Sequence, residues 1–278
     1  MILKSYSKIN LTLSVNKKLK NGLHEIQSFF SLVNLYDEIK IKKIQGGKDV
    51  VKFAGKFSKY INKNNNSIKY TLEILRKKKL ISDHYSVLIN KKIPVYAGLG
   101  GGTSNAACLI KYFNKNKIKD DLLSNFEKKI GSDLRLFFHN QGFLNSLKII
   151  KDSRKKYAMH FLLIYPNIKN STGYIYSKVR KYSPKFKHSW DKINDKKKFI
   201  RFIVNKNNDL QSIVENEYPV IGEIISEIAN KKGCYFSRLT GSGSVCYGLF
   251  KNERSAKAAL IRIKSKYPKF WFSVTKTI

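Results

Sequence analysis

The sequence predicts a two-domain protein that mixes strands and helices, of the α+β or α/β class. A length of 278 residues suits two domains at about 150 residues each. Hydrophobic residues make up 42% of the chain and aromatic residues 13%, which is enough to form packed cores. Strand-like and helix-like segments alternate in both halves, without an internal repeat. These observations exclude a disordered, collagen-like or coiled-coil chain.

The first 45 residues are predicted to be extended. Apolar and polar residues alternate from Lys8 to Val15, and a turn is expected at residues 20–22. Two further strands, at 26–35 and 38–44, are separated by short polar breaks. We therefore expect an antiparallel meander at the start of the chain.

A helix is predicted within residues 62–79, because apolar side chains recur there at helical spacing and an asparagine-rich start precedes them. The apolar positions are Ile68, Leu72 and Leu75. A strand at 85–90 follows, and residues 94–114 then read as a glycine-rich loop that leads into a second helix.

The charged stretch at 151–156 predicts a domain boundary, so we place the domains at 1–153 and 154–278. The second domain is expected to open with a strand at 159–165 and to continue with a lysine-rich, helical middle. A glycine turn at 240–243 should then precede a strand, a helix and a last strand.

The chain is strongly basic, with 55 Lys and Arg against 19 Asp and Glu and a formal net charge of +36. Such a balance often indicates nucleic-acid binding. Here the lysines are scattered along the chain beside abundant Asn, Ile, Tyr and Phe, which is typical of AT-rich coding. We favour composition drift over a nucleic-acid surface, although the positive field would attract phosphorylated ligands.

Membrane and disulfide classes are not expected. Lys or Asn interrupts every apolar run before the roughly 18 to 20 residues that a membrane span needs. The alternating start of the chain reads as a strand and not as a signal peptide. The chain has three cysteines, Cys108, Cys234 and Cys246. Their odd number and their spacing indicate neither a disulfide framework nor a zinc site. We therefore expect a cytoplasmic protein in a reducing compartment.

The most informative segment is the glycine loop, in which four of the five residues 98–102 are glycine. Glycines let backbone N–H groups converge on a ligand, and the helix start that follows favours anions, so we predict a phosphate cradle. The alternative, a flexible helix entry, needs fewer glycines. Thr103 stands where a Walker A loop needs Lys and where a dinucleotide fingerprint needs Gly or Ala, so both of those loops are disfavoured.

Three segments in this order resemble the motifs of the GHMP small-molecule kinases: residues 7–11, 98–107 and 239–243. Further segments resemble the branch of that superfamily that phosphorylates the 2-hydroxyl of 4-diphosphocytidyl-2-C-methylerythritol in the non-mevalonate isoprenoid pathway; they are residues 22–28, 131–133, 208–210 and 218–219. The resemblance covers nearly the whole chain. It implies a GHMP kinase fold, with an N-terminal domain like ribosomal protein S5, a C-terminal ferredoxin-like α/β domain and an active site in the cleft between them.

The resemblance implies that Lys8 and Asp133 are the catalytic residues. From sequence alone, Asp133 serves equally well as a cap after a turn, and Lys8 as a solvated strand residue. In the kinase reading, Asp133 accepts the proton of the substrate hydroxyl. A cation nearby would keep its carboxylate ionised and would orient or acidify that hydroxyl. Which of the two moves the proton stays open.

The resemblance also implies the substrate contacts, namely Asn10, His24, Thr172, Tyr176 and Gly241. Asn10 would bind the methylerythritol part, and His24 would read the cytosine edge. Related kinases have an aromatic residue before this histidine, whereas this chain has Leu23. Tyr176 is expected to stack on the base. The alternative for His24 is a hydrogen-bonded histidine in the turn after Gly22, and the alternative for Tyr176 is ordinary packing.

ATP is expected on the glycine loop, at Pro94, Val95, Tyr96, Ala97, Gly98, Leu99, Gly100, Gly101, Gly102, Thr103 and Ser104. Mg²⁺ should accompany the nucleotide and be held chiefly by it. Thr103 and Ser104 offer the nearest oxygens, but no protein residue is assigned as a metal ligand.

Two departures from the family pattern concern the acceptor side. Residues 134–136 replace a Val-Pro-Val-like run, and residues 145–147 replace a glycine-rich turn. The remaining alternatives are a GHMP kinase for another small alcohol and an RNA-binding protein that uses the positive surface. We expect a small-molecule substrate, a cytidine diphosphate-linked sugar alcohol, with no membrane or nucleic-acid partner and a monomer or weak homodimer.

Overall fold

The computed structural model describes residues 2–115, 118–153, 155–186, 193 and 195–278. The chain forms two compact units. Unit 1 comprises Met1–Lys8, Leu35–Val95 and Gly100–His139, and unit 2 comprises Ile9–Asn34, Tyr96–Leu99 and Asn140–Ile278. The units are interleaved along the sequence, and the domain boundary at residue 153 remains a prediction.

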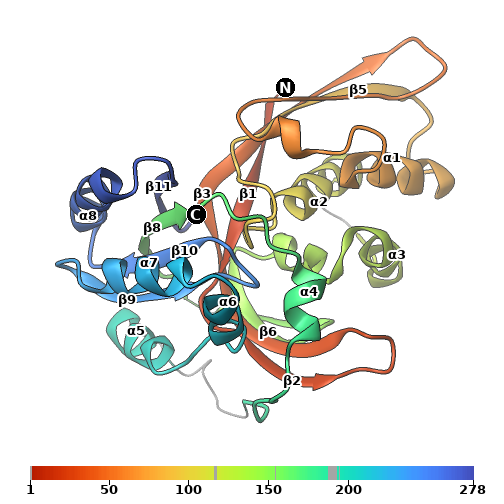
Figure 1. Ribbon diagram of the computed structural model, residues 1–278. Coiled ribbons are helices and arrows are strands. Elements are labelled where there is room, and N and C mark those ends of the chain that lie inside the picture. The colour runs from red at the N-terminus through yellow and green to blue at the C-terminus, as the bar shows by residue number, and fades with distance from the viewer. Residues whose placement is uncertain (1, 116–117, 154, 187–192, 194) are drawn as a thin grey trace. The chain divides into compact units, whose positions relative to one another are not determined.

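Unit 1 combines strands with three helices that pack together (Figure 1). Its elements are β1 (Ile2–Asn10) as far as Lys8, the second half of β3 (His24–Ile44), β4 (Val50–Ala54), the 3₁₀ helix η1 (Ser58–Tyr60), α1 (Ser67–Lys77), β5 (His84–Asn90), α2 (Gly101–Phe113), α3 (Asp120–Ile130) and the 3₁₀ helix η2 (Ser132–Phe138). β5 pairs antiparallel with β3 and parallel with β4. Helix α1 packs against α2 and α3, and η2 packs against α2 and α3.

Helix α1 confirms the sequence prediction, including its start. The Asn66 side chain accepts hydrogen bonds from the backbone N–H groups of Ile68 and Lys69, as an N-cap does. Ile68, Leu72 and Leu75 are buried on one face of the helix, as their spacing predicts.

Unit 2 contains a four-stranded antiparallel sheet in the order β11-β8-β10-β9. The strands are β8 (His160–Tyr165), β9 (Cys234–Leu239), β10 (Cys246–Phe250) and β11 (Trp271–Lys276). Helix α7 (Val220–Ala229) packs against β9 and β10, and α8 (Glu253–Lys266) packs against β8 and β11 (Figure 1). The order β-α-β-β-α-β is that of a ferredoxin-like fold, so this prediction is confirmed.

The rest of unit 2 comprises the end of β1, β2 (Ser14–Lys18), the first half of β3, β6 (Gln141–Ser146), β7 (Ile149–Asp152), α4 (Thr172–Ser177), α5 (Lys196–Val204) and α6 (Gln211–Glu217). The predicted strand at 159–165 and the helical middle are therefore present, as are the strand, helix and strand after residue 243. Among the described residues, no helix combines the length and the apolar character that a bilayer crossing requires.

The predicted meander is wrong in one respect. The two strands expected at 26–35 and 38–44 form one strand, β3, and both β1 and β2 pair with β3. β3 remains continuous because its partner changes along its length: Ser28–Ser31 pair with β6, and Glu38–Ile44 pair with β5. The polar residues between these segments mark a change of neighbour and not a turn.

Candidate active site

The glycine loop leads directly into helix α2, as predicted. Gly100 is the N-cap residue, with φ 68° in the left-handed region. A Cβ on Gly100 would lie 2.7 Å from Cζ of Phe137, so a side chain at this position would meet both backbone strain and a clash. This position therefore requires glycine.

The second glycine turn packs beside the first part of the loop within unit 2. A Cβ on Gly98 would lie only 2.2 Å from the carbonyl oxygen of Thr240. The backbone N–H of Val245 also donates to the carbonyl oxygen of Ala97 at 3.2 Å. The turn at residues 240–243 therefore packs beside residues 97–98 of the loop.

The start of α2 suits a phosphate group. The first turn of a helix has backbone N–H groups without intrahelical partners and carries a partial positive charge. Among the described residues, no side chain caps this end, and residues 101–103 present a glycine-rich, partly exposed surface. The close approaches at Gly98 and Gly100 exclude a Cβ atom at these two positions of the loop. This arrangement fits the polyphosphate of ATP.

Lys8 and Asp133 meet in unit 1. Nζ of Lys8, on β1, lies 3.3 Å from Oδ2 of Asp133, at the start of η2. The Lys8 side chain is 4% exposed and that of Asp133 is 38% exposed. Cε of Lys8 also lies 3.4 Å from the position of a Cβ on Gly100. The predicted catalytic pair therefore adjoins the glycine loop, with its carboxylate on the accessible side.

Arg135, in the run 134–136 that departs from the family pattern, has a structural role. Its guanidinium binds both oxygens of Glu127, at 3.0 and 3.1 Å, and also contacts the Asp120 carboxylate. Both partners belong to α3, and Arg135 is only 7% exposed. The arginine thus fastens η2, which carries Asp133, to the neighbouring helix.

A buried ion pair lies beneath the loop. Nζ of Lys91 contacts Oδ2 of Asp37 and donates to Oδ1 of Asn105 at 3.0 Å. The other Asp37 oxygen accepts the backbone N–H groups of Lys92 and Ile93 at 2.7 and 2.9 Å. Burial lowers the pKa of the Lys91 ammonium, and the Asp37 carboxylate counteracts that effect. This cluster fixes the chain immediately before the loop.

The same cluster fixes the chain after the loop. Nδ2 of Asn105 donates to Asp37 at 3.0 Å and to Oγ of Ser5 at 2.9 Å. Oγ of Ser5 lies 2.7 Å from Oγ of Ser104, which donates to the carbonyl oxygen of Tyr6. Both ends of the loop are therefore bonded to β1 and β3, and β1 also carries Lys8.

Asn10 is buried in unit 2 and already has polar partners. Its Nδ2 donates to Oγ of Ser28 at 2.8 Å, and its backbone N–H donates to Oγ1 of Thr240 at 3.0 Å. Only 3% of Asn10 is exposed. The strand position and the side-chain orientation of Asn10 are thus fixed by these bonds.

His24 belongs to an aromatic group in unit 2. Its ring centroid lies 5.1 Å from that of Tyr176 and 6.3 Å from that of Tyr182. Burial and, secondarily, the charge of Lys18 lower the pKa of His24 below the usual range of histidine. A neutral imidazole offers one donor and one acceptor, which suits the edge of a nucleobase. The neighbouring Leu23 is 46% exposed.

Thr172 and Gly241 also lie in unit 2, around the second glycine turn. Oγ1 of Thr172 lies 3.0 Å from Oγ of Ser242. The carbonyl oxygen of Gly241, which has φ 58°, accepts a hydrogen bond from Nδ2 of Asn208 at 2.8 Å. Asn208 also binds the carbonyl oxygen of Leu239, so the segment recognised at 208–210 holds this turn in shape.

Within the described ranges, no three His, Cys, Asp or Glu side chains converge as a metal site. Ser104, one of the two oxygens considered for Mg²⁺, is 4% exposed and hydrogen-bonded to Ser5 and Tyr6. Thr103 is more accessible. These residues fit a cation that is held by the nucleotide.

Sequence reasoning missed the roles of Asp37, Lys91 and Arg135. Asn105 belonged to the recognised glycine-loop segment, but nothing in its spacing pointed to Asp37, 68 residues earlier. A signal for Lys91 was equally absent in a chain with 55 basic residues.

Comparisons with known proteins identify the fold and the family. The family model for the GHMP kinases N terminal domain matches residues 66–134, and the model for the GHMP kinases C terminal matches residues 192–269. Among solved structures, a 4-(cytidine 5'-diphospho)-2C-methyl-D-erythritol kinase aligns with a TM-score of 0.76 at 20% identity, covering 100% of both chains. Homoserine kinase from Cytophaga hutchinsonii aligns at 0.68 and 14% identity, over 100% of this chain and 94% of the other. The fold and the glycine loop thus define a small-molecule kinase of the GHMP class.

Curated relatives show which family within the GHMP kinases this chain resembles. The 4-diphosphocytidyl-2-C-methyl-D-erythritol kinase of Pelagibacter ubique is 36% identical, over 99% of this chain and 98% of its own. The enzyme of the same name from Wolbachia pipientis is 31% identical over the same shares. This chain belongs to the family of 4-diphosphocytidyl-2-C-methyl-D-erythritol kinases. It is an ATP-dependent small-molecule kinase.

Proposed function

We propose that this kinase transfers the γ-phosphoryl group of ATP to the 2-hydroxyl of 4-diphosphocytidyl-2-C-methyl-D-erythritol, a step toward isoprenoid precursors. The observation that carries the proposal is the 3.3 Å contact between Lys8 Nζ and Asp133 Oδ2 beside Gly100. The proposed acceptor is the one named for the two curated relatives, and the alignment with this chain covers 98% of each relative.

Phosphoryl transfer needs an aligned hydroxyl, a group that accepts its proton and neutralisation of the charge that moves. Asp133 supplies the accessible carboxylate oxygen that receives the hydroxyl proton. Lys8 supplies a fixed cation at 3.3 Å from that carboxylate, where it attracts the negative charge that develops on the attacking oxygen. Its burial leaves little freedom to move away.

ATP binds on the glycine loop in this proposal, with its phosphates at the N-terminus of α2. Mg²⁺ bound to the nucleotide would neutralise part of the polyphosphate charge. The cluster of Asp37, Lys91 and Asn105 keeps both ends of the loop in position, so that the backbone N–H groups are oriented before the nucleotide arrives.

The acceptor contacts are proposed from residues that the fold already orders. Asn10, held by Ser28, borders the methylerythritol part. His24 and Tyr176 contact the cytosine base, and Thr172 and Gly241 complete the acceptor site. We further propose that the active form is a monomer or a weak homodimer. Analytical ultracentrifugation at the assay concentration measures this oligomeric state.

The deciding experiment is an ADP-release assay with ATP, Mg²⁺ and one of three alcohols: the cytidine diphosphate compound, homoserine or mevalonate. We expect turnover with the cytidine compound alone. Turnover with homoserine or mevalonate alone would instead make the chain a GHMP kinase for another small alcohol. Silence with all three, from protein shown to be folded, would overturn the proposed function.

Matched variants test the proposed base. Asp133→Asn should abolish turnover without unfolding the protein. Asp121→Asn, an exposed carboxylate in the first turn of α3, is the control and should behave as the wild type. Normal turnover by Asp133→Asn would refute the assigned role.

A further inference from the structure

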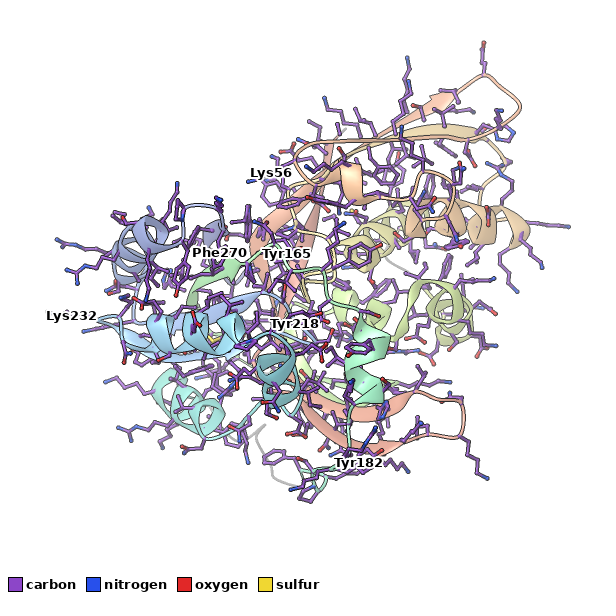
Figure 2. The ribbon with its side chains drawn as sticks, in the orientation of Figure 1. Lys56, Tyr165, Tyr182, Tyr218, Lys232 and Phe270 are labelled. Atoms are coloured by element: carbon purple, nitrogen blue, oxygen red, sulfur yellow. The ribbon has the colours of Figure 1, made fainter. Side chains whose placement is uncertain are left out.

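The aromatic group around His24 contains one residue, Tyr182, that is not among the proposed acceptor contacts. Tyr182 lies on the segment after α4, and Figure 2 labels it there. Its ring is nearly parallel to that of His24, at an interplanar angle of 27° and a centroid distance of 6.3 Å. Tyr176 approaches the same imidazole at 5.1 Å and 31°. Three rings of similar orientation are thus gathered at one place in unit 2.

Tyr182 is not a core residue. It is 44% exposed, whereas Tyr157, with 8%, and Tyr247, with 0%, are packed in the interior of the same unit. An exposed aromatic ring that remains beside other rings offers a face to a planar ligand. Tyr182 therefore has the accessibility that a stacking residue needs and that the buried tyrosines lack.

The backbone around Tyr182 is anchored to the hairpin that carries His24. The N–H of Ser183 donates to the carbonyl oxygen of Val15 at 2.8 Å. Nδ2 of Asn16 donates to the carbonyl oxygen of Ser183 at 3.0 Å. Both partners belong to β2, and Lys18 of β2 is directly opposite His24 of β3 in the strand register. The position of Tyr182 relative to His24 is thus set by one main-chain hydrogen bond and one hydrogen bond from the Asn16 side chain.

Leu23 cannot supply a ring for stacking beside His24. It precedes His24 directly and is 46% exposed, but its aliphatic side chain has no π face. A cytosine ring beside His24 gains stacking energy only from rings that other segments supply. Tyr176 is one of them, and Tyr182 is the more exposed second.

We propose that Tyr182 is a substrate-binding residue of the acceptor site: its ring stacks on the cytosine base and takes the place of an aromatic residue at position 23. This inference rests on the proposed acceptor. The ligand chemistry is a pyrimidine nucleoside diphosphate, recognised by stacking on tyrosine and by hydrogen bonds to a neutral imidazole.

The test compares Tyr182→Leu, Tyr182→Phe and Tyr174→Leu. Tyr174 is a fitting control because it is 41% exposed on α4 and bonds to Glu217 instead of His24. Loss of one stacking face should raise the KM for the cytidine acceptor roughly 5- to 150-fold in Tyr182→Leu. The KM for ATP should stay unchanged, and Tyr182→Phe and Tyr174→Leu should match the wild type. An unchanged acceptor KM in Tyr182→Leu would overturn the proposal.

A double variant tests whether the ring of Tyr182 replaces an aromatic ring at position 23. Adding Leu23→Tyr to Tyr182→Leu should lower the raised acceptor KM again. A KM that stays high would overturn the claim that position 182 replaces position 23.

Calorimetric titration with CDP separates the two proposals. Wild-type protein should bind CDP, and Tyr182→Leu should bind it more weakly by a similar factor. If wild-type protein turns over the cytidine acceptor but Tyr182→Leu binds CDP equally well, only the role of Tyr182 fails. If wild-type protein neither turns over the acceptor nor binds CDP, the proposed function fails as well.

Discussion

Nζ of Lys8 lies 3.3 Å from Oδ2 of Asp133, and the two side chains differ sharply in exposure, at 4% and 38%. The cation is thus fixed inside unit 1, while the carboxylate remains open to a ligand. Lys8 comes from β1 and Asp133 from η2, so two separate elements build the pair.

The first prediction concerns this pair. If Lys8 and Asp133 act as one unit, Lys8→Met and Asp133→Asn should each remove most of the turnover, and the double variant should lose little more than either single variant. Single-turnover assays of the three variants measure this. Losses that multiply in the double variant would indicate independent roles. Lys4→Met, on the same strand, is the control and should retain turnover.

The second prediction concerns Gly100. Gly100→Ala puts a side chain at φ 68° and 2.7 Å from Phe137, so the loop must shift. We expect roughly a 100-fold loss of kcat/KM for ATP, as displaced catalytic groups typically cause. Stability should fall by about 1 to 3 kcal/mol.

Gly102 provides the matched control for stability. It lies inside α2, and the nearest atom to its added Cβ, Oγ of Ser67, is 3.6 Å away. Gly102→Ala should therefore stabilise the protein by about 0.5 to 1 kcal/mol in urea unfolding. A loss of stability for Gly102→Ala as large as that for Gly100→Ala would contradict this difference.

The third prediction concerns the ion pair beneath the loop. Asp37→Asn leaves the Lys91 ammonium, only 1% exposed, without its carboxylate, and should cost about 3 to 5 kcal/mol of unfolding free energy. Adding Lys91→Met removes the unpaired charge, so the double variant should be more stable than Asp37→Asn. Denaturant unfolding gives both values. A double variant less stable than the single one would disprove the coupling.

The fourth prediction concerns Arg135. Arg135→Lys keeps the charge but loses the two-pronged contact with Glu127, which lysine cannot reproduce. We expect a stability loss of about 1 to 3 kcal/mol and a lower kcat, because η2 also carries Asp133. Arg262→Lys, on the exposed face of α8, should change neither quantity. A normal kcat for Arg135→Lys would show that Asp133 is positioned without this contact.

The fifth prediction is a pH dependence from His24, whose pKa is lowered mainly by burial. Between the folded pKa and the higher pKa of the unfolded chain, the unfolded state binds the extra proton. Stability should therefore rise with pH through this window and be lost as the pH falls through it. Urea unfolding at several pH values should show a smaller slope for His24→Gln than for the wild type. Equal slopes, or an NMR titration of His24 at or above the usual histidine range, would rule this out.

The sequence alone determined those parts of the protein that local chemistry controls. The glycine loop and the start of α2 were predictable because left-handed backbone at Gly98 and Gly100 suits glycine. The start of α1 was predictable because the Asn66 cap lies within three residues of the groups it bonds. The resemblance to the family motifs further predicted Lys8 and Asp133 as catalytic residues, because motif residues are recognised by their type and their order along the chain.

Only the tertiary structure decided which distant residues meet. Asp37 and Lys91 are 54 residues apart, and neither has a local pattern that names the other. β3 stays continuous because β6 and β5 follow one another as its partners, which no feature of residues 24–44 reveals. Tyr182 comes to His24 through bonds to β2. The physical reason is common to all three: helix caps and glycine turns depend on neighbours in sequence, whereas pairing, burial and ring contacts depend on neighbours in space.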